Sequence, residues 1–200
     1  MSTPAGAAGD ILARMAQKLA AAGIPYMVVG SFASSLHGVP RTTQDLDIVI
    51  DPNDFALRTL VQSLPELEYY VDLNAALDAL RRRTLFNVID MKTGWKVDLV
   101  IRKARSFSVE ELKRRTAVAL LGADTFVSTP EDTIIAKLEW AKVGCSEMQL
   151  RDAAGIIEVR GSGLDTEYVE HWTAALNLQE QWLKAQELAR PKRAWPHEPE

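Results

Sequence analysis

Hydrophobic and polar positions along the first part of the chain follow two spacings, one typical of strands and one typical of helices. Alternation or short apolar runs predict strands over 26–29, 45–50, 67–71, a hairpin of 86–90 with 96–101, and a second hairpin within 116–128. Helical spacing predicts helices over 10–22 and 32–37. Two more helices are predicted to begin at capping residues, one at Asp51 with Pro52 in its first turn and one at Asp72. The sheet is therefore expected to be mixed, with helices between its strands.

From Thr129 onward the pattern becomes helical, and Thr129-Pro130-Glu131-Asp132 is a strong helix start. Helical spacing continues to about residue 190, with breaks near Gly144 and near Gly161-Ser162-Gly163. The apolar residues of this part are expected to form its core: Leu138, Trp140, Ala141, Ile156, Ile157, Tyr168, Trp172, Leu176 and Leu183.

Together these patterns predict an α+β chain of two domains. Residues 1–128 are expected to form a mixed β-sheet with flanking helices, and 129–190 a small helical domain. Three prolines and mixed charge predict a disordered tail over 191–200. With 47% hydrophobic residues, a chain of 200 residues can bury a substantial core.

The Gly30-Ser31 step is a candidate phosphate site. It lies where an apolar strand turns directly into a helix, and the unpaired N–H groups and positive dipole end of a helix N-terminus favour an anion. A glycine at this turn lets a triphosphate approach the backbone closely, and the Ser31 hydroxyl can add a hydrogen bond.

Three aspartates form a candidate metal site. Asp45 and Asp47 are two residues apart on an expected strand, so their side chains share a face, where two carboxylates repel unless a cation lies between them. Asp98 lies on another expected strand, and the three carboxylates converge if the two strands are neighbours. Such a trio can hold two ions, one on a nucleotide's phosphates and one on an attacking hydroxyl, as in-line displacement at phosphorus requires.

These residues resemble the signature of the DNA polymerase beta-type nucleotidyltransferase superfamily. That signature is an apolar residue, Gly, then Gly or Ser, a spacer, Asp-apolar-Asp-apolar and a third carboxylate; Gly30, Ser31, Asp45, Asp47 and Asp98 fill its positions. Further residues, within roughly 20–160, are similar to the bacterial abortive-infection AbiE toxins (AbiEii) and their small relatives: His37-Gly38, Arg41-Thr42-Thr43-Gln44, Thr129-Pro130-Glu131-Asp132 and Lys137-Leu138.

The resemblance implies a nucleotidyltransferase-type fold and a metal-dependent transfer of an NMP from an NTP to an acceptor hydroxyl, with release of pyrophosphate. It makes Asp45, Asp47 and Asp98 catalytic residues that bind two Mg²⁺ or Mn²⁺ ions. In such relatives a helical Lys and a downstream Arg-Asp motif contribute to nucleotide binding. The expected nucleotide-binding residues are thus Gly30, Ser31, Arg41, Lys137 and Asp152.

The acceptor stays open at this stage. A toxin-like enzyme acting on tRNA or other RNA, one that modifies a protein hydroxyl and one that adenylylates a small molecule would share all these residues. The toxin resemblance also implies a cognate antitoxin as a partner. A different class of protein is the alternative: a catalytically silent module that binds nucleotide or a partner in a defence or toxin–antitoxin system. The intact set of three aspartates argues against it.

The sequence Asp-x-Asp-x-Val also occurs in the nucleophile loop of haloacid-dehalogenase-type phosphatases. There the aspartates follow a hydrophobic strand, whereas here the apolar run Ile48-Val49-Ile50 comes after them. The phosphatase interpretation also leaves Gly30-Ser31 and Asp98 unexplained, and it is the less favoured alternative.

Four of the singled-out side chains have structural alternatives. His37 could face the triphosphate or bond the backbone at a helix end. Arg41 could clamp phosphate or acceptor, or form a salt bridge. Lys137 could be a surface lysine, and Asp152 could pair with Lys137, Arg151 or a helix end.

The net charge of −4 argues against a generic nucleic-acid coat. Basic clusters at expected loops or strand ends could nevertheless line one RNA-binding face: Arg81-Arg82-Arg83, Arg102-Lys103-Ala104-Arg105 and Lys113-Arg114-Arg115. The single cysteine, Cys145, excludes an internal disulfide and fits a reducing compartment. The sequence shows neither a signal-peptide pattern nor an apolar run long enough for a membrane span, so a cytoplasmic location is expected.

Overall fold

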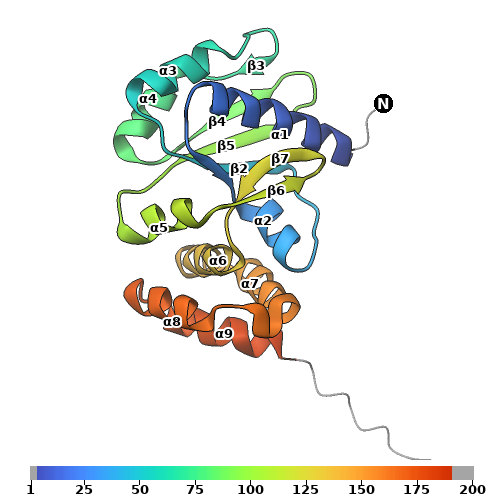
Figure 1. The fold of residues 1–200 in the computed structure, drawn as a ribbon, viewed down its shortest axis with the longest axis vertical. Helices are drawn as coiled ribbons and strands as arrows, with labels where there is room; N and C mark the ends of the chain where they lie inside the picture. The colour runs from blue at the N-terminus through green and yellow to red at the C-terminus, as the bar shows by residue number, and fades with distance from the viewer. Residues whose placement is uncertain (1–3, 191–200) are drawn as a thin grey trace, which may run out of the picture.

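Strands and helices follow one another along the chain as Figure 1 shows. The computed structural model describes residues 4–190, and the expected tail over 191–200 lies outside these residues. The strands are β1 (Tyr26–Val28), β2 (Asp45–Ile50), β3 (Tyr69–Tyr70), β4 (Leu85–Asp90), β5 (Lys96–Ile101), β6 (Thr116–Leu120) and β7 (Ala123–Val127). The helices are α1 (Pro4–Ala21), α2 (Gly30–His37), α3 (Asp54–Gln62), α4 (Leu73–Arg82), α5 (Ser106–Arg114), α6 (Pro130–Gly144), α7 (Glu147–Arg160), the 3₁₀ turn η1 (Gly161–Gly163), α8 (Thr166–Ala175) and α9 (Gln179–Ala189).

The strands form one seven-stranded mixed sheet with the order β3-β4-β5-β2-β1-β7-β6. Strand β2 pairs with β5, and β1 with β7, in parallel, whereas the other neighbours are antiparallel. Helices α1, α3 and α4 cover one face of the sheet, while α2, α5 and the C-terminal helices lie on the other side (Figure 1). The predicted α+β fold with a mixed sheet is confirmed.

Burial alternates along the central strands. In β2, the residues Leu46, Ile48 and Ile50 are buried in the main hydrophobic core together with residues of α1 and α3. The intervening positions of β2 are only partly buried and face the opposite side. Because side chains alternate along a strand, this pattern fixes which row points to the core and which row points to the C-terminal helices.

A second hydrophobic cluster joins the C-terminal helices. It contains Ile134 and Leu138 of α6, Ile156 of α7 and Val169 of α8, and Phe107 of α5 also belongs to it. Phe107 therefore attaches the helices to the sheet-forming part of the chain. The domain boundary after residue 128 remains a prediction. Among the helices of residues 4–190, none combines the length and the apolar character that crossing a bilayer requires.

Helix α3 begins later than the sequence predicts. Asp51 was expected as its cap, but the helix starts at Asp54 and Asn53 is the N-cap, accepting a hydrogen bond from the Ala56 N–H at 2.8 Å. The Asp51 carboxylate instead pairs with Arg102 at 2.9 Å. The prediction was wrong because a long-range ion pair engages the Asp51 side chain.

Helix α5 was not predicted either. Its sequence was interpreted as basic residues at loops or strand ends, yet Ser106–Arg114 is helical and buries Phe107 and Leu112. The basic residues stand at the two ends of this helix, which obscures its short apolar face in the sequence.

Two residues expected in the core of the helical part are exposed. Trp140 is 62% exposed and Leu183 60% exposed, whereas Leu138, Ala141 and Ile156 are buried as predicted. Helical spacing identifies the apolar stripes of a helix but not which stripe meets a partner.

Helix α2 is tied to the C-terminal helices through His37. Its Nε2–H donates to the Ser128 carbonyl at 2.6 Å, and its Nδ1 accepts from Arg160 at 2.8 Å. Arg160 also donates to the His37 carbonyl at 3.1 Å. Burial lowers the pKa of His37, which favours the neutral ring that these bonds require. The structural alternative for His37 is thus confirmed.

Gly38, at the end of α2, makes a close backbone contact with α7. A Cβ at this position would lie 2.7 Å from the Ile156 nitrogen and 2.8 Å from the Gly155 carbonyl carbon. We expect Gly38→Ala to lower the free energy of unfolding by about 1–3 kcal/mol, because the backbone of α7 must move. Urea denaturation measures the change. Gly163→Ala is the matched control, since nothing lies within 4 Å of its added Cβ. Equal stabilities of the two variants would contradict the prediction.

Candidate active site

The turn from β1 into α2 brings the backbone against Asp47. Gly30 has a φ of +64°, and a Cβ at this position would lie 2.0 Å from the Asp47 Oδ2 atom. Glycine alone meets both conditions without strain. The Val29 N–H donates to the Asp47 carbonyl at 2.9 Å, which holds the start of α2 against β2. An anion bound at the N-terminus of α2 would thus lie beside the Asp47 carboxylate.

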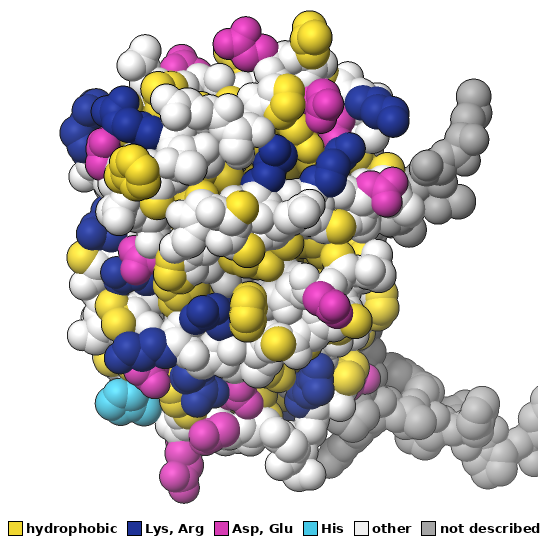
Figure 2. Space-filling model, turned by 45° about the horizontal axis from the view of Figure 1, so that its top comes forward, with side chains coloured by type: hydrophobic (Ala, Val, Ile, Leu, Met, Phe, Trp, Pro, Cys, Tyr) yellow, Lys and Arg dark blue, Asp and Glu magenta, His cyan; other side chains and the backbone are white. Residues whose placement is uncertain are grey.

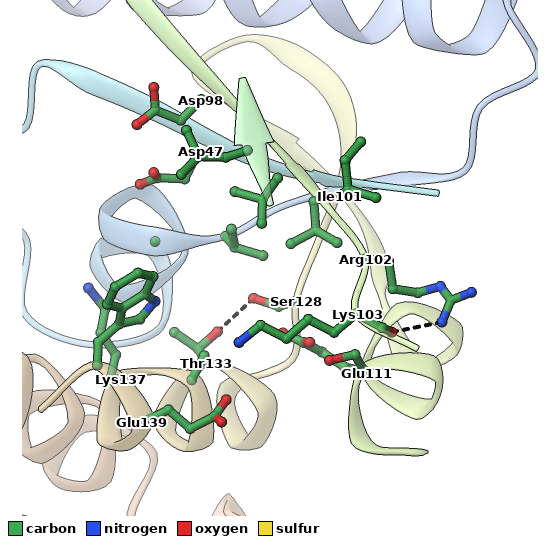
Figure 3. A pocket seen from close by; sticks show the side chains of 18 of the residues that line it. Asp47, Asp98, Ile101, Arg102, Lys103, Glu111, Ser128, Thr133, Lys137 and Glu139 are labelled. Atoms are coloured by element: carbon green, nitrogen blue, oxygen red, sulfur yellow. Dashed lines mark hydrogen bonds between the residues drawn. The ribbon is translucent and has the colours of Figure 1, made fainter. Parts of the chain in front are cut away.

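The pairing of β2 with β5 places carboxylates opposite one another. The parallel register aligns Asp47 with Asp98 and Asp45 with Lys96. All four side chains share the face of the sheet that lies opposite the main core. Figure 3 shows Asp47 and Asp98 close together at one end of a cavity. The two strands are therefore neighbours, which is the condition under which the three carboxylates converge.

Asp47 is the carboxylate most affected by its surroundings. Burial and, next, the Asp98 carboxylate raise the pKa of Asp47 to about 6, and Asp45 acts in the same direction. The cations of Lys137 and Lys96 oppose this rise. At neutral pH the ionised Asp47 is therefore held at a cost in free energy, which a bound cation would relieve.

Two side chains from neighbouring strand positions hold Asp98. The Lys96 Nζ atom lies 3.2 Å from the Asp98 Oδ2 atom and 3.6 Å from the Asp45 Oδ1 atom. Asn87 of β4 donates an amide hydrogen to the other Asp98 oxygen. The Lys96 ammonium thus supplies a positive charge between two of the three carboxylates.

The chemistry of these three carboxylates fits a hard divalent cation. Asp45, Asp47 and Asp98 offer the oxygen ligands that Mg²⁺ prefers, and burial, followed by the charge of Asp98, raises the pKa of Asp47. Within residues 4–190, however, no group of three or more His, Cys, Asp or Glu side chains is arranged to hold a metal ion. Asp45 and Asp98 pair with Lys96, so a shared metal site requires these side chains to turn toward Asp47.

A chain of charged side chains connects α2 to the C-terminal helices. Lys137 of α6 lies 2.8 Å from the Asp152 carboxylate of α7, and both are largely buried. The Arg41 Nε–H donates to the same carboxylate at 3.1 Å, and another Arg41 N–H donates to the Ser31 hydroxyl. Two cations thus share one carboxylate, which leaves a net positive charge beside the start of α2.

A cavity of about 310 Å³ extends from the aspartates between the sheet and the C-terminal helices. Gly30, Ser31, Asp47, Asp98 and Lys137 line the part beside α2, and its other walls include Val49, Val100, Ile101, Trp140 and Glu111. Figure 3 shows Glu111 and Lys103 at the opposite end from Asp47 and Asp98. The cavity therefore joins the turn at Gly30-Ser31 and the carboxylates to a partly open space between the sheet and the C-terminal helices.

Glu111 is an unusual wall residue, because it is only 7% exposed. Burial, followed by the Asp132 carboxylate, raises the pKa of Glu111 to about 8, while Arg105 and Lys103 oppose the rise. Its side chain is therefore mostly protonated at neutral pH.

The predicted site residues come together in one region. Five of them line the cavity, and the remaining three, Asp45, Arg41 and Asp152, contact Lys96, Ser31 and Lys137. Sequence reasoning missed Asn87, Lys96, Glu111 and Trp140. The alternation of β5 could have placed Lys96 on the face of Asp98, but no pattern in the sequence indicated the burial of Glu111 or the exposure of Trp140.

Solved structures with the same arrangement are nucleotidyltransferase-like proteins. An antigenic nucleotidyltransferase-like protein from Paracoccidioides brasiliensis has a TM-score of 0.54 and 18% identity, over 92% of this chain and 93% of that chain. ANT(2″)-Ia in complex with adenylyl-2″-tobramycin has a TM-score of 0.57 and 14% identity, over 88% of this chain and 99% of that chain. The chain has the nucleotidyltransferase fold.

At these identities the similarity concerns the nucleotidyltransferase fold alone. No family model and no curated protein matches the sequence. The two structures above are not described as AbiE toxins, so that narrower resemblance stays a prediction.

The raised pKa of Asp47 predicts how stability depends on pH. Between the ordinary value of 3.8 and about 6, the folded state binds more protons than the unfolded state, so stability falls as pH rises through this window. In metal-free buffer we expect Asp47→Asn to raise the free energy of unfolding by about 1–2 kcal/mol at about pH 8, and to change it little at about pH 3.5.

Urea denaturation at the two pH values measures this difference. Asp124→Asn is the control, because Asp124 is an exposed aspartate on β7. A loss of stability for Asp47→Asn at the higher pH would contradict the expected repulsion.

Proposed function

We propose that this protein is a metal-dependent nucleotidyltransferase that moves an NMP from an NTP to an acceptor hydroxyl and releases pyrophosphate. The observation that carries the proposal is the register of β2 and β5, which sets Asp47 opposite Asp98 on the same face as Asp45, directly beside Gly30. The nucleotidyltransferase fold supports it at the level of architecture.

The start of α2 is proposed to hold the β- and γ-phosphates. Backbone N–H groups at a helix N-terminus and the positive end of its dipole favour an anion. The positive φ of Gly30 and its contact with Asp47 let the phosphates approach both the backbone and the carboxylates. The Ser31 hydroxyl, now bonded to Arg41, is available as a further ligand.

Asp45, Asp47 and Asp98 are proposed to hold two Mg²⁺ ions. When bound, such ions neutralise the triphosphate and lower the pKa of the acceptor hydroxyl. Asp98 accepts the proton of the acceptor hydroxyl, and the hydroxyl oxygen forms a bond to the α-phosphorus. The bond between the α-phosphorus and the oxygen that bridges to the β-phosphate breaks, which releases pyrophosphate. Asn87 and Lys96 hold the Asp98 carboxylate until the ions bind, since both contact it in this structure.

Lys137 is proposed to contact the triphosphate. Its ammonium lies in the cavity wall beside Gly30 and Ser31 and lowers the pKa of Asp47 by its charge. Asp152 acts as a positioning residue, because it holds both Lys137 and Arg41 in place. The net positive charge of this trio stabilises the phosphates, and Lys137 and Asp152 are largely buried whereas the Arg41 side chain is 31% exposed.

The acceptor is proposed to approach from the exposed side of the aspartates. The Asp45 side chain is 51% exposed, whereas that of Asp98 is 15% exposed. RNA, a protein and a small molecule all remain candidates, and the ANT(2″)-Ia structure contains an adenylylated small molecule, tobramycin.

Paired charges weaken the case for an RNA-binding face. Most residues of the three basic clusters form ion pairs within the chain: Arg81 and Arg82 with Asp78, Arg102 with Asp51, Arg105 with Glu139, Lys113 with Glu110, and Arg114 with Glu131 and Asp132. On the face shown in Figure 2, basic side chains are scattered and acidic side chains lie among them. RNA is therefore one of three acceptor classes that the assay below distinguishes. A toxin role and a cognate antitoxin stay predictions from the AbiE resemblance.

A catalytically silent nucleotide-binding module is the second candidate. The contacts of Lys96 with Asp45 and Asp98 favour it, because the ammonium competes with a metal ion for both carboxylates. Such a module would bind NTP but transfer nothing.

The first test is transfer of label from each α-³²P-labelled NTP, with Mg²⁺ or Mn²⁺, to total RNA, proteins or small molecules of a cell extract. We expect Asp45→Asn and Asp47→Asn each to lower the rate at least about a hundredfold, because they remove ligands that stabilise the transferred phosphoryl group. Separation of RNA, protein and small-molecule fractions also identifies the acceptor class.

Asp124→Asn serves as the control for this assay and should transfer label at the wild-type rate. Retained transfer in Asp45→Asn or Asp47→Asn would refute the assignment of these carboxylates. Binding of NTP without any transfer would favour the silent module instead.

Substitution of Lys137 tests the phosphate contact. We expect Lys137→Met to weaken NTP binding about ten- to a hundredfold, because a charge-assisted hydrogen bond to phosphate is lost. Arg41 continues to neutralise Asp152, so the fold should persist. Isothermal titration calorimetry measures the affinity. Lys142→Met on the same helix is the matched control, since Lys142 donates to the Asn177 carbonyl and is not one of the residues that line the cavity. Equal affinities of the two variants would exclude the contact.

A further inference from the structure

Glu111 is a buried carboxyl that the proposed transfer does not explain. It lies on α5 at the far end of the cavity from Asp47 and Asp98 (Figure 3). Within residues 4–190 its carboxyl group has no hydrogen-bond or ion-pair partner, although it is 7% exposed. The nearby Arg105 is engaged in two hydrogen bonds with Glu139. The carboxyl group lines the cavity, where a bound ligand can supply its hydrogen-bond partner, so the arrangement points to a ligand at this end.

The protonation state of Glu111 defines what it can bind. The charged groups around it are Asp132 and Glu139 of α6, which raise its pKa, and Arg105 and Lys103, which lower it. With a pKa of about 8, the group is mostly a neutral carboxylic acid at neutral pH. It then offers one O–H donor and one carbonyl acceptor side by side.

The residues that line the cavity suit a flat ring. Trp140 of α6 lines it and is 62% exposed, and Val49 and Val100 lie in the wall formed by the sheet. An indole with an aliphatic surface in the same cavity is a favourable environment for a planar heterocycle. Ile101, which also lines the cavity, is three residues beyond Asp98 on β5, about 10 Å along the strand.

The carboxylates lie between an exposed side and the cavity side. Asp47 and Asp98 line the cavity, whereas Asp45 and Lys96 do not and are more exposed. The exposed Asp45 gives a large acceptor such as RNA or a protein access from the exposed side. The nucleoside of an NTP whose phosphates lie at α2 has the cavity side available to it.

We infer that this cavity is the nucleobase subsite, in which Glu111 pairs with the edge of the base and Trp140 stacks on its ring. The inference rests on the proposed function. Adenine, cytosine, guanine and uracil all present an adjacent donor and acceptor, so a neutral carboxylic acid holds any of them without selecting one. The protein is therefore a base-permissive enzyme that accepts all four NTPs.

Equilibrium binding separates the base from the phosphates. Calorimetry with Mg²⁺ compares the four NTPs with inorganic tripolyphosphate, which has no base. We expect the four NTPs to bind within about tenfold of one another and Glu111→Ala to weaken each about tenfold, with tripolyphosphate unaffected. Glu111→Gln, which keeps a donor and an acceptor, should retain most of the affinity. Glu110→Ala is the matched control, because its side chain is 43% exposed and pairs with Lys113.

Trp140→Ala provides a second, independent variant. It should weaken NTP binding about tenfold through lost stacking and leave tripolyphosphate binding unchanged. Val143→Ala, on the same helix and 79% exposed, is its control. Thermal unfolding of every variant shows whether a loss of affinity reflects a loss of folded protein.

The outcomes separate this inference from the proposed function. If neither NTPs nor tripolyphosphate bind, the proposed function fails and the inference fails with it. If NTPs bind but Glu111→Ala and Trp140→Ala leave their affinity unchanged, or one base is strongly preferred, only the nucleobase subsite is overturned. If Glu111→Gln is as weak as Glu111→Ala, a charged carboxylate is required, and the far end of the cavity holds a cationic group instead.

Discussion

The parallel pairing of β2 with β5 is the constraint on which the site depends. It sets Asp47 opposite Asp98 and so brings like charges together at the centre of the sheet. The register is fixed from the other face, where the apolar residues of both strands lie in the main core. A slip of one residue would move the aspartates into that core, so the cost of burying charge there prevents it. The hydrophobic core thus enforces an electrostatic repulsion that the strands alone would avoid.

Compensating charges come from both parts of the chain. Lys96 is supplied by the same strand as Asp98, whereas Lys137 comes from α6 and is held by Asp152 of α7. The site therefore requires the C-terminal helices to be docked, and the contacts at the end of α2 provide that docking. His37 bonds the Ser128 carbonyl just before α6 and accepts from Arg160 at the end of α7. Packing and electrostatics are coupled here. Helix α2 starts at the Gly30-Ser31 turn, and its last residue, His37, holds in place the helices that carry Lys137 and Asp152.

Local signals in the sequence predicted most of the fold. Alternation predicted β2 and β5, and the Thr129 and Asp72 side chains cap α6 and α4 as expected. Failures occurred where a distant residue decides the outcome. Asp51 is taken by Arg102, so α3 starts at a different cap. Exposure of Trp140 and burial of Glu111 depend on how α5 and α6 face the sheet, which no periodicity encodes. The aspartates were predictable because their spacing on one strand fixes their shared face, while their neighbours Asn87 and Lys96 follow only from strand pairing.

The two sides of the aspartate cluster differ in how closely their side chains restrict a ligand. On the cavity side, the lining residues and the buried carboxyl of Glu111 restrict the chemistry of a ligand. On the other side, Asp45 and Lys96 are partly exposed, and the ordinary paired charges around them impose no particular shape. A solvent-facing edge of this kind accommodates ligands of many sizes, and specificity there comes from surfaces that a partner brings with it. The proposed metal ligands therefore constrain the proposed reaction closely and its acceptor only weakly.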